Sequence, residues 1–97
     1  MESQAHSMGW KLRPDILEIK TKRGVVKLKP GHIFVEATGE KDPVLNLPWK
    51  YKYKQCYIVT KEDHARDPEQ WDGFPVGTLI PRVEFVREDN VISVVTK

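Results

Sequence analysis

The segment Trp49-Lys-Tyr-Lys-Tyr-Lys54 carries residue types with which a chain can bind single-stranded nucleic acid. Proteins of that kind combine a basic groove for the backbone with aromatic rings on which bases stack. In an extended strand, however, alternation places the rings on one face and the candidate phosphate contacts Lys50 and Lys52 on the other. A shared platform then requires a strong twist or a bulge. The alternative is an amphipathic strand with its rings in the core and its lysines in solvent or protecting an edge.

A second group of cations lies in a predicted hairpin. The segment that contains it, residues 11–29, is basic, with seven basic side chains and two acidic ones. A hairpin tip and outer face of this kind can lie against phosphates. No base-reading motif accompanies it. The alternative is the solvated face of a moderately basic domain. The candidate binding residues are Lys20, Lys22, Arg23, Lys27 and Lys29.

An acidic segment, residues 61–72, holds five carboxylates and two basic side chains. Its Asp63, Asp67 and Asp72 lack the spacing of a calcium loop. Carboxylates near the start of short helical turns are also expected from the helix dipole alone. We therefore predict no metal site.

Cys56 and His64 are the pair that could be imagined as nucleophile and base. No orienting motif accompanies them, and Cys56 is interpreted as a small buried hydrophobe. The motifs G-x-x-x-x-G-K-[ST], G-x-S-x-G, H-E-x-x-H and C-x-x-C are all absent. We predict no catalytic residue, no cofactor and no enzymatic activity.

Trp71 and Phe74 lie in a loop that is rich in glycine and proline. Such residues either close the end of a barrel or form a contact surface. If they are exposed, both are suitable anchors for a protein partner.

Alternation of apolar and polar residues predicts the strands that position these groups. Residues 16–21 and 25–29 form a hairpin, since Gly24 can take the positive φ that a three-residue turn with a bulge needs. Residues 32–37 form a third strand, and residues 49–60 form the longest one.

The helical candidate is residues 61–70, where Thr60 and Asp63 resemble a capping box. Pro68 must end or restart it, so we expect one or two short helical turns within residues 61–71. Residues 78–87 and 91–96 are predicted to form a C-terminal hairpin. The expected core comprises Leu17, Ile19, Val26, Leu28, Ile33, Val35, Tyr51, Tyr53, Tyr57, Val83, Phe85, Ile92 and Val94.

The 97 residues are 39% hydrophobic and carry a net charge of only +2, which excludes a disordered chain. Residues 1–9 are predicted to be a flexible tail, and residues 10–97 a single small β domain. Its six short strands predict an all-β fold, a small five- to six-stranded barrel or a tight sandwich built from hairpins.

No apolar run approaches the ~18 residues of a membrane span, and the first nine residues lack the features of a signal peptide. A single cysteine excludes an internal disulfide. We therefore expect a soluble intracellular protein, cytoplasmic and not bound to membrane.

Two hypotheses of function remain. The first is a non-enzymatic protein-interaction module (adaptor, inhibitor or assembly subunit) that uses charged faces to bind a protein partner or to self-associate. The second is a nucleic-acid-binding small β-barrel that contacts the phosphates of DNA or RNA through the basic hairpin and the lysine-rich strand. The first is favoured because basic and acidic residues are segregated along the chain, and because the pI of 8.7 lies below that of typical nucleic-acid-binding domains.

Overall fold

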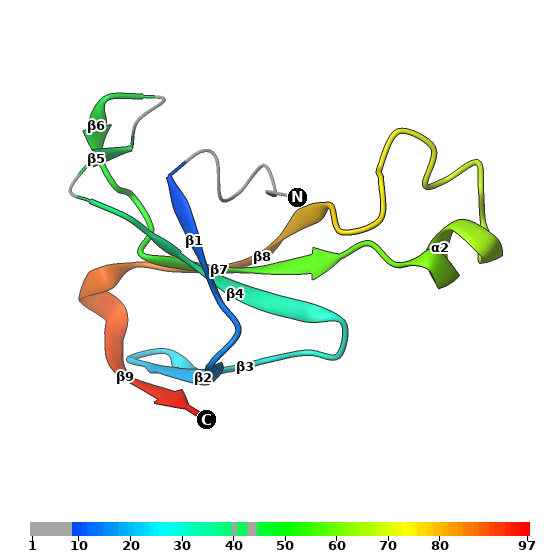
Figure 1. Cartoon of the computed structure of the whole chain (residues 1–97). Helices are drawn as coiled ribbons and strands as arrows, with labels where there is room; N and C mark the ends of the chain where they lie inside the picture. The colour runs from blue at the N-terminus through cyan, green and yellow to red at the C-terminus, as the bar shows by residue number, and fades with distance from the viewer. Residues whose placement is uncertain (1–8, 40, 43–44) are drawn as a thin grey trace.

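Two antiparallel sheets make up most of the chain in the computed structural model, which describes residues 9–39, 41–42 and 45–97 (Figure 1). The four-stranded sheet has the order β1-β4-β7-β8, and the three-stranded sheet has the order β3-β2-β9. The first sheet comprises β1 (Trp10–Arg13), β4 (His32–Ala37), β7 (Tyr53–Ile58) and β8 (Leu79–Val86). The second comprises β2 (Ile16–Thr21), β3 (Gly24–Lys27) and β9 (Val91–Thr96).

Two smaller elements project from the sheets (Figure 1). One is the two-stranded ribbon of β5 (Lys41–Asp42) and β6 (Leu47–Pro48), and the other is the lobe that contains helix α2 (Lys61–Arg66). The prediction of a mostly β fold with a short helix is confirmed. The described strands do not close into a barrel. Apart from Gly9, the predicted tail lies outside the described residues.

The main core lies between the two sheets. Its buried members come from β2, β4, β7 and β8: Ile16, Ile19, Phe34, Tyr53 and Val86. A second cluster of Val35, Cys56 and Leu79 covers the opposite face of the four-stranded sheet. Because adjacent residues of a strand point to opposite faces, burial of both Phe34 and Val35 means that β4 is covered on both sides.

The first hairpin forms as predicted, with Gly24 at φ 128°. Its tip is tighter than expected, because Thr21 pairs directly with Gly24 and leaves only Lys22 and Arg23 between the strands. The side chain of Thr21 secures the tip, since its Oγ1 donates to the carbonyl of Gly24 at 2.7 Å and accepts from the amide of Arg23 at 3.1 Å.

The predicted long strand over residues 49–60 is wrong at both ends. Only β7 is regular, and residues 49–52 run as irregular chain. Lys52 still keeps strand-like hydrogen bonds to both neighbouring strands, because its amide donates to the carbonyl of Val86 at 2.8 Å and its carbonyl accepts from the amide of Ala37 at 2.8 Å. The backbone of Lys52 therefore still joins β4 to β8, although both ladders begin at Tyr53. The register shift of the β7–β8 ladder lies further along the strand, between Lys54 and Cys56.

The predicted C-terminal hairpin is also wrong. β8 pairs with β7 in one sheet, whereas β9 pairs with β2 in the other. The 3₁₀ turn η1 (Glu88–Asn90) carries the chain from the first sheet to the second. As a result Phe85 and Ile92 do not pack against each other, and they are 41% and 66% exposed.

The expected core is confirmed for its best-buried members and wrong for others. Ile19, Val35 and Tyr53 are buried, whereas Leu17, like Phe85 and Ile92, is exposed. Partly buried positions are Val26, Leu28, Ile33, Tyr51, Tyr57 and Val94. The side chain of Val83 lies outside the described part of the structure. The register shift between Ile16 and Glu18 explains the wrong face for Leu17, since this irregularity interrupts the alternation and places both Ile16 and Ile19 in the core.

Helix α2 begins as the sequence predicts. Thr60 is its N-cap, and Thr60 and Asp63 exchange both hydrogen bonds of a capping box. Asp67 then caps a separate turn by accepting from the amide of Gln70 at 3.2 Å. Within the described residues, no helix is long and apolar enough to cross a membrane.

Candidate functional site

The strongest candidate site is a groove of about 420 Å³ between the first hairpin and the end of β8. We call it the Tyr51 groove. Its floor and walls include Arg23 and Val25 from the hairpin, Phe85 and Arg87 from the end of β8, Asn90 from η1, and Tyr51 itself.

An aromatic pair forms one wall of the Tyr51 groove. The rings of Tyr51 and Phe85 are 5.1 Å apart between centroids and are inclined by 30°. Phe85 is 41% exposed, so its ring offers surface to a ligand. The hairpin tip is held beside this pair because the amide of Lys22 donates to the carbonyl of Asn90 at 2.9 Å.

A second hollow, of about 330 Å³, lies on the other side of Tyr51. Trp49, Lys52 and Glu88 line it together with Tyr51. Trp49 is held there by two contacts. Its Nε1 donates to the carbonyl of Thr38 at 2.8 Å, and its ring centroid lies 5.0 Å from that of Trp10. Rings and cations thus share one surface, which a regular strand over residues 49–52 would not allow.

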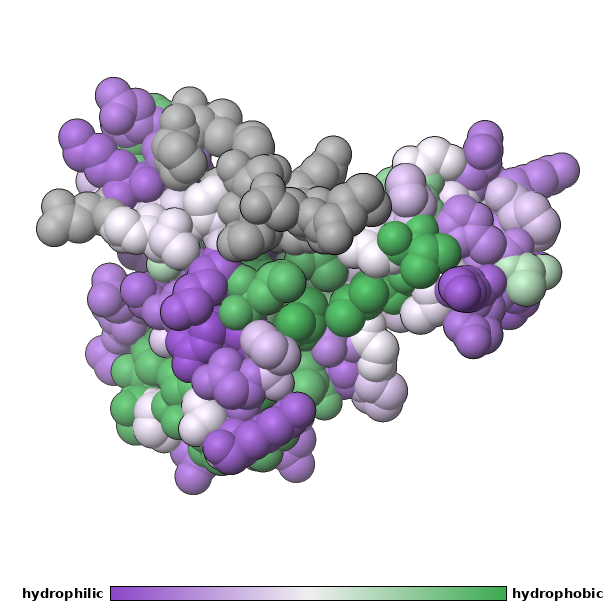
Figure 2. Space-filling view, in the orientation of Figure 1, coloured by the Kyte–Doolittle hydropathy of each residue, from purple (hydrophilic) through white to green (hydrophobic). Residues whose placement is uncertain are grey.

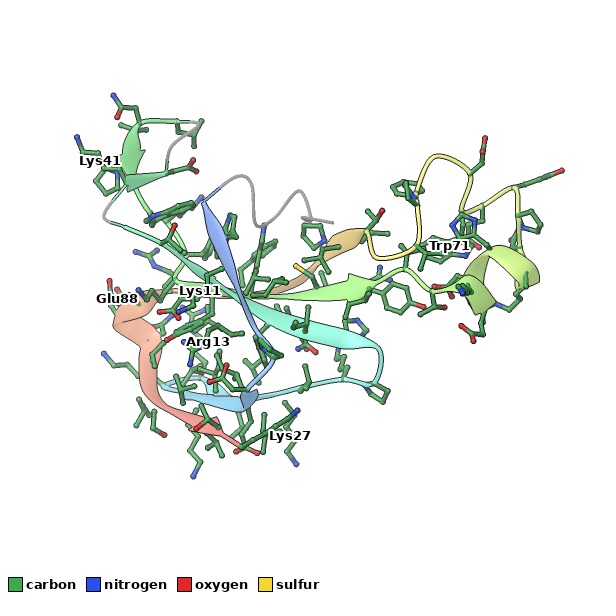
Figure 3. All side chains as sticks on the ribbon, viewed as in Figure 1. Lys11, Arg13, Lys27, Lys41, Trp71 and Glu88 are labelled. Carbon is green, nitrogen blue, oxygen red and sulfur yellow. The ribbon has the colours of Figure 1, made fainter. Side chains whose placement is uncertain are left out.

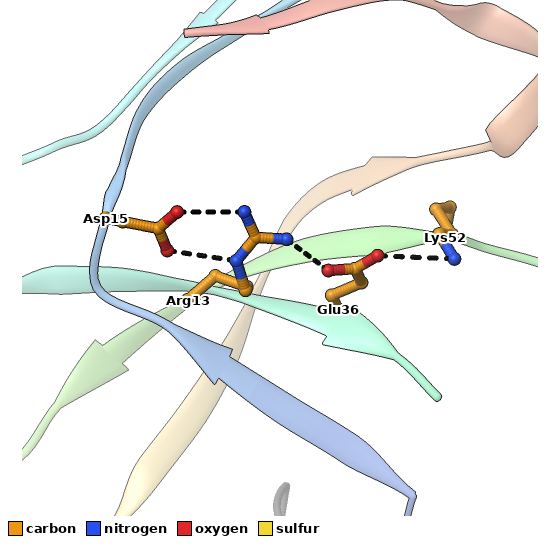
Figure 4. Close-up of polar contacts among 4 residues, drawn as sticks. All are labelled: Arg13, Asp15, Glu36 and Lys52. Carbon is orange, nitrogen blue, oxygen red and sulfur yellow. Dashed lines mark hydrogen bonds and ion pairs between the residues drawn. The ribbon is translucent and has the colours of Figure 1, made fainter. Parts of the chain in front are cut away.

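Lys52 takes part in an ion-pair network rather than standing free (Figure 4). Its Nζ lies 3.3 Å from a carboxylate oxygen of Glu36, and the other oxygen of Glu36 accepts from Arg13. Arg13 also holds Asp15 through two hydrogen bonds of 2.9 Å. This hydrogen-bonded guanidinium lowers the pKa of Asp15 to about 2, and the same bond raises the pKa of Arg13.

The predicted basic face of the hairpin is interrupted by carboxylates. Lys27 lies directly across the ladder from Glu18, and Lys29 forms an ion pair with Glu84 at 3.0 Å. By contrast, no ion pair within the described part of the chain involves Lys20, Lys22, Arg23 or Lys50. The structure therefore brings Arg23 to Tyr51 but leaves Lys27 and Lys29 away from the groove.

Lys50 lies on the far rim of the same region. With Trp49, Arg87, Glu88 and Asp89 it lines a third hollow, of about 420 Å³. Its Nζ lies 5.6 Å from the ring centroid of Tyr51. The rim carries both signs of charge, and Arg87 and Asp89 form an exposed ion pair at 3.5 Å.

Trp71 and Phe74 belong to the α2 lobe, at the opposite end of the molecule from Glu88 (Figure 3). Trp71 is only 9% exposed and packs between Tyr57 and Phe74, at centroid distances of 5.9 Å and 6.3 Å. Phe74 is 42% exposed. A binding role for this loop stays a prediction, and Phe74 is the member of the pair with substantial ring surface available.

A buried carboxylate organises the same lobe. Asp63 is 2% exposed and accepts hydrogen bonds from the hydroxyl of Tyr57, the amide of Thr60 and the guanidinium of Arg66. The Tyr57 hydrogen bond, followed by that of Thr60, lowers the pKa of Asp63. The same bond raises the pKa of Tyr57.

Cys56 and His64 do not meet. Cys56 is fully buried in the second core cluster, and burial raises the pKa of its thiol. The His64 ring nitrogen Nε2 lies 2.7 Å from the carbonyl of Phe74. Across residues 9–39, 41–42 and 45–97, no group of three or more His, Cys, Asp or Glu side chains is placed to hold a metal ion.

The sequence did not predict Val25, Phe85, Arg87 or Asn90 as binding residues, although all four line the Tyr51 groove. Alternation had assigned Phe85 to the core, and Arg87 carried no local signal beyond its place after a strand. The register shift between Lys54 and Cys56 in the β7–β8 ladder leaves no mark in the sequence.

Comparison with protein-family models, with curated proteins and with solved structures finds no match to this chain.

Proposed function

We propose that this chain is a non-enzymatic protein-interaction module that binds a protein partner through the Tyr51 groove. The observation that carries the proposal is the exposed Phe85 ring, stacked on Tyr51 and flanked by Arg23 and Arg87. Tyrosine and arginine are among the residues that dominate the binding energy of protein interfaces.

The charge around the groove supports a protein as the partner. Glu88 and Asp89 stand beside Arg87 on the adjoining rim. Of the predicted basic residues, Lys27, Lys29 and Lys52 each lie opposite or beside a carboxylate. A polyanion would have to compete with these carboxylates, whereas a protein surface can present complementary charges of both signs.

The test is capture of proteins from nuclease-treated native lysate with the purified chain. The groove variant, Arg23→Ala with Phe85→Ala, should lose the proteins captured by the wild type. The control variant, Lys61→Ala with Leu45→Ala, removes one exposed cation and one exposed apolar side chain elsewhere. It should retain them. Equal capture by the two variants would exclude the groove as the interface.

The second candidate function is binding of single-stranded nucleic acid by the same surface. One observation favours it: Trp49, Tyr51 and Lys52 line a common hollow because residues 49–52 are not a strand. Stacking rings interleaved with cations are what such binding requires. Labelled single- and double-stranded oligonucleotides, titrated at low salt, test it. Binding should weaken by about one log-log unit of salt per phosphate neutralised. Absence of binding at roughly tens of micromolar protein would remove this candidate.

A further inference from the structure

The edge strand β9 is unlike the other outer strands of the described sheets. Its one ladder is with β2, and its second edge has no strand partner among the described residues. Exposed edges are usually protected by charged side chains, especially lysine, or by proline. β1 carries Lys11 and Arg13, β3 carries Lys27, and β8 carries Pro81 and Arg82. β9 reads Val-Ile-Ser-Val-Val-Thr and has neither protection.

The side chains of β9 favour addition of another strand. Four of its six residues are valine or isoleucine, and Ile92 is 66% exposed. Hydrophobic colour gathers at the corner of the molecule where β9 runs (compare Figures 1 and 2). β-branched side chains pack well on a pleated sheet, and an unprotected apolar edge is a template for pairing with another chain.

We infer that β9 pairs antiparallel with β9 of a second copy of this chain, forming a dimer with two-fold symmetry. The three-stranded sheets then join into one sheet of order β3-β2-β9-β9-β2-β3. This inference is independent of the Tyr51 groove and of the partner proposed for it.

Charge complementarity favours a second copy of the chain as the partner of β9. In an antiparallel pair each strand begins where its partner ends. Glu88 and Asp89 come just before β9, and Lys97 follows it directly. Self-pairing therefore brings Lys97 of each copy toward the acidic residues of the other, and no like charges face each other within the strand.

The pairing register of two β9 strands is also compatible with a two-fold axis. A two-fold axis at Val94 pairs Ser93 with Val95 and Val91 with Lys97. Ser93 and Val95 already share one face, because they lie opposite Lys20 and Glu18 of β2. Val94, which packs on the main core, then lies beside its own copy on the inner face.

Sedimentation velocity over roughly 5 to 500 micromolar protein tests the inference. The wild type should show a reversible monomer–dimer equilibrium. Ser93→Lys places a lysine in the unprotected edge and should weaken dimerisation at least about tenfold. The matched control is Val25→Lys on β3. Lys20 lies opposite both Ser93 and Val25, so each variant adds the same lysine–lysine neighbour. Val25→Lys should dimerise like the wild type.

A wild type that sediments as a monomer at every concentration would overturn the inference, and so would equal effects of the two variants. Hydrogen exchange on the wild type provides a measurement that needs no variant. Amides of β9 should gain protection as concentration rises, whereas those of β3, at the other edge of the same sheet, should not. A gain of amide protection at β3 instead, or no gain of protection at β9, would contradict pairing through β9.

Discussion

Asp63 joins the α2 lobe to strand β7 through a single carboxylate. It accepts hydrogen bonds from the hydroxyl of Tyr57 in β7, from the amide of Thr60 at the helix start, and from the guanidinium of Arg66 within the helix. A buried carboxylate with this many donors is stabilised in its charged form. We therefore expect the lobe to be more stable when Asp63 is ionised.

The first prediction concerns the pH dependence of this residue. Because the folded pKa of Asp63 is lowered, its stabilisation is complete above the pKa of the unfolded chain and is lost as pH falls through the folded value. Asp63→Asn should lower the melting temperature by several degrees at about pH 7, and by much less at about pH 2.5. Asp72→Asn, an exposed control in the same segment, should change neither melt. A deficit for Asp63→Asn that is equal at both pH values would show that its ionisation does not stabilise the lobe.

At the scale of elements, the turn between β3 and β4 depends on close contact with Tyr57. The carbonyl of Gly31 accepts from the amide of Ile58 at 2.9 Å, which holds the turn against the end of β7. Gly31 has φ 76°, and a Cβ added there would lie 3.3 Å from Cε1 of Tyr57. The position combines an unfavourable backbone conformation for other residues with a tight approach.

The second prediction separates these two effects. Gly39 has a similar φ of 71°, but an added Cβ would meet nothing within 4 Å. Gly39→Ala should therefore cost only the left-handed strain, about 1–2 kcal/mol. Gly31→Ala should cost more, because the Tyr57 ring must also move. Chemical denaturation of the two variants measures the difference. Equal losses would mean that the ring yields freely.

The elements that sequence predicts correctly are those with local signals. The capping box at Thr60, the existence of the first hairpin and the β-branched strand 32–37 each depend on residues a few positions apart. The length of the turn before Gly24 was predicted one residue too long. The candidate surface was predicted in part: Arg23 lines the Tyr51 groove, and Lys52 and Lys50 line the two hollows beside it. Phe85 was assigned to the wrong face because its neighbours are set by a register shift and by a crossing between sheets, which are long-range features.

For the whole molecule, the main consequence of the fold is that two sheets share one core while two appendages do not. Residues of β2, β4, β7 and β8 bury their side chains in the same cluster. In the β5–β6 ribbon, by contrast, Leu45 and Leu47 are 65% and 58% exposed. The sheets should therefore unfold together, and the ribbon should open alone.

The third prediction is a hierarchy of amide exchange. Amides of β4, β7 and β2, the inner strands with a neighbour on each side, should exchange only through global unfolding. The free energy of that exchange should lie within the about 5–15 kcal/mol of ordinary domains. The amides of Lys41, Asp42 and Leu47 should exchange through local opening at a free energy close to zero, since the β5–β6 ribbon buries little apolar surface. Native-state hydrogen exchange in low denaturant measures both. If the free energy of opening were much lower for β2 than for β4, the two sheets would be separate cooperative units. The core between them would then contribute less to stability than its burial indicates. Strong protection of the ribbon would instead mean that it packs against another surface in solution.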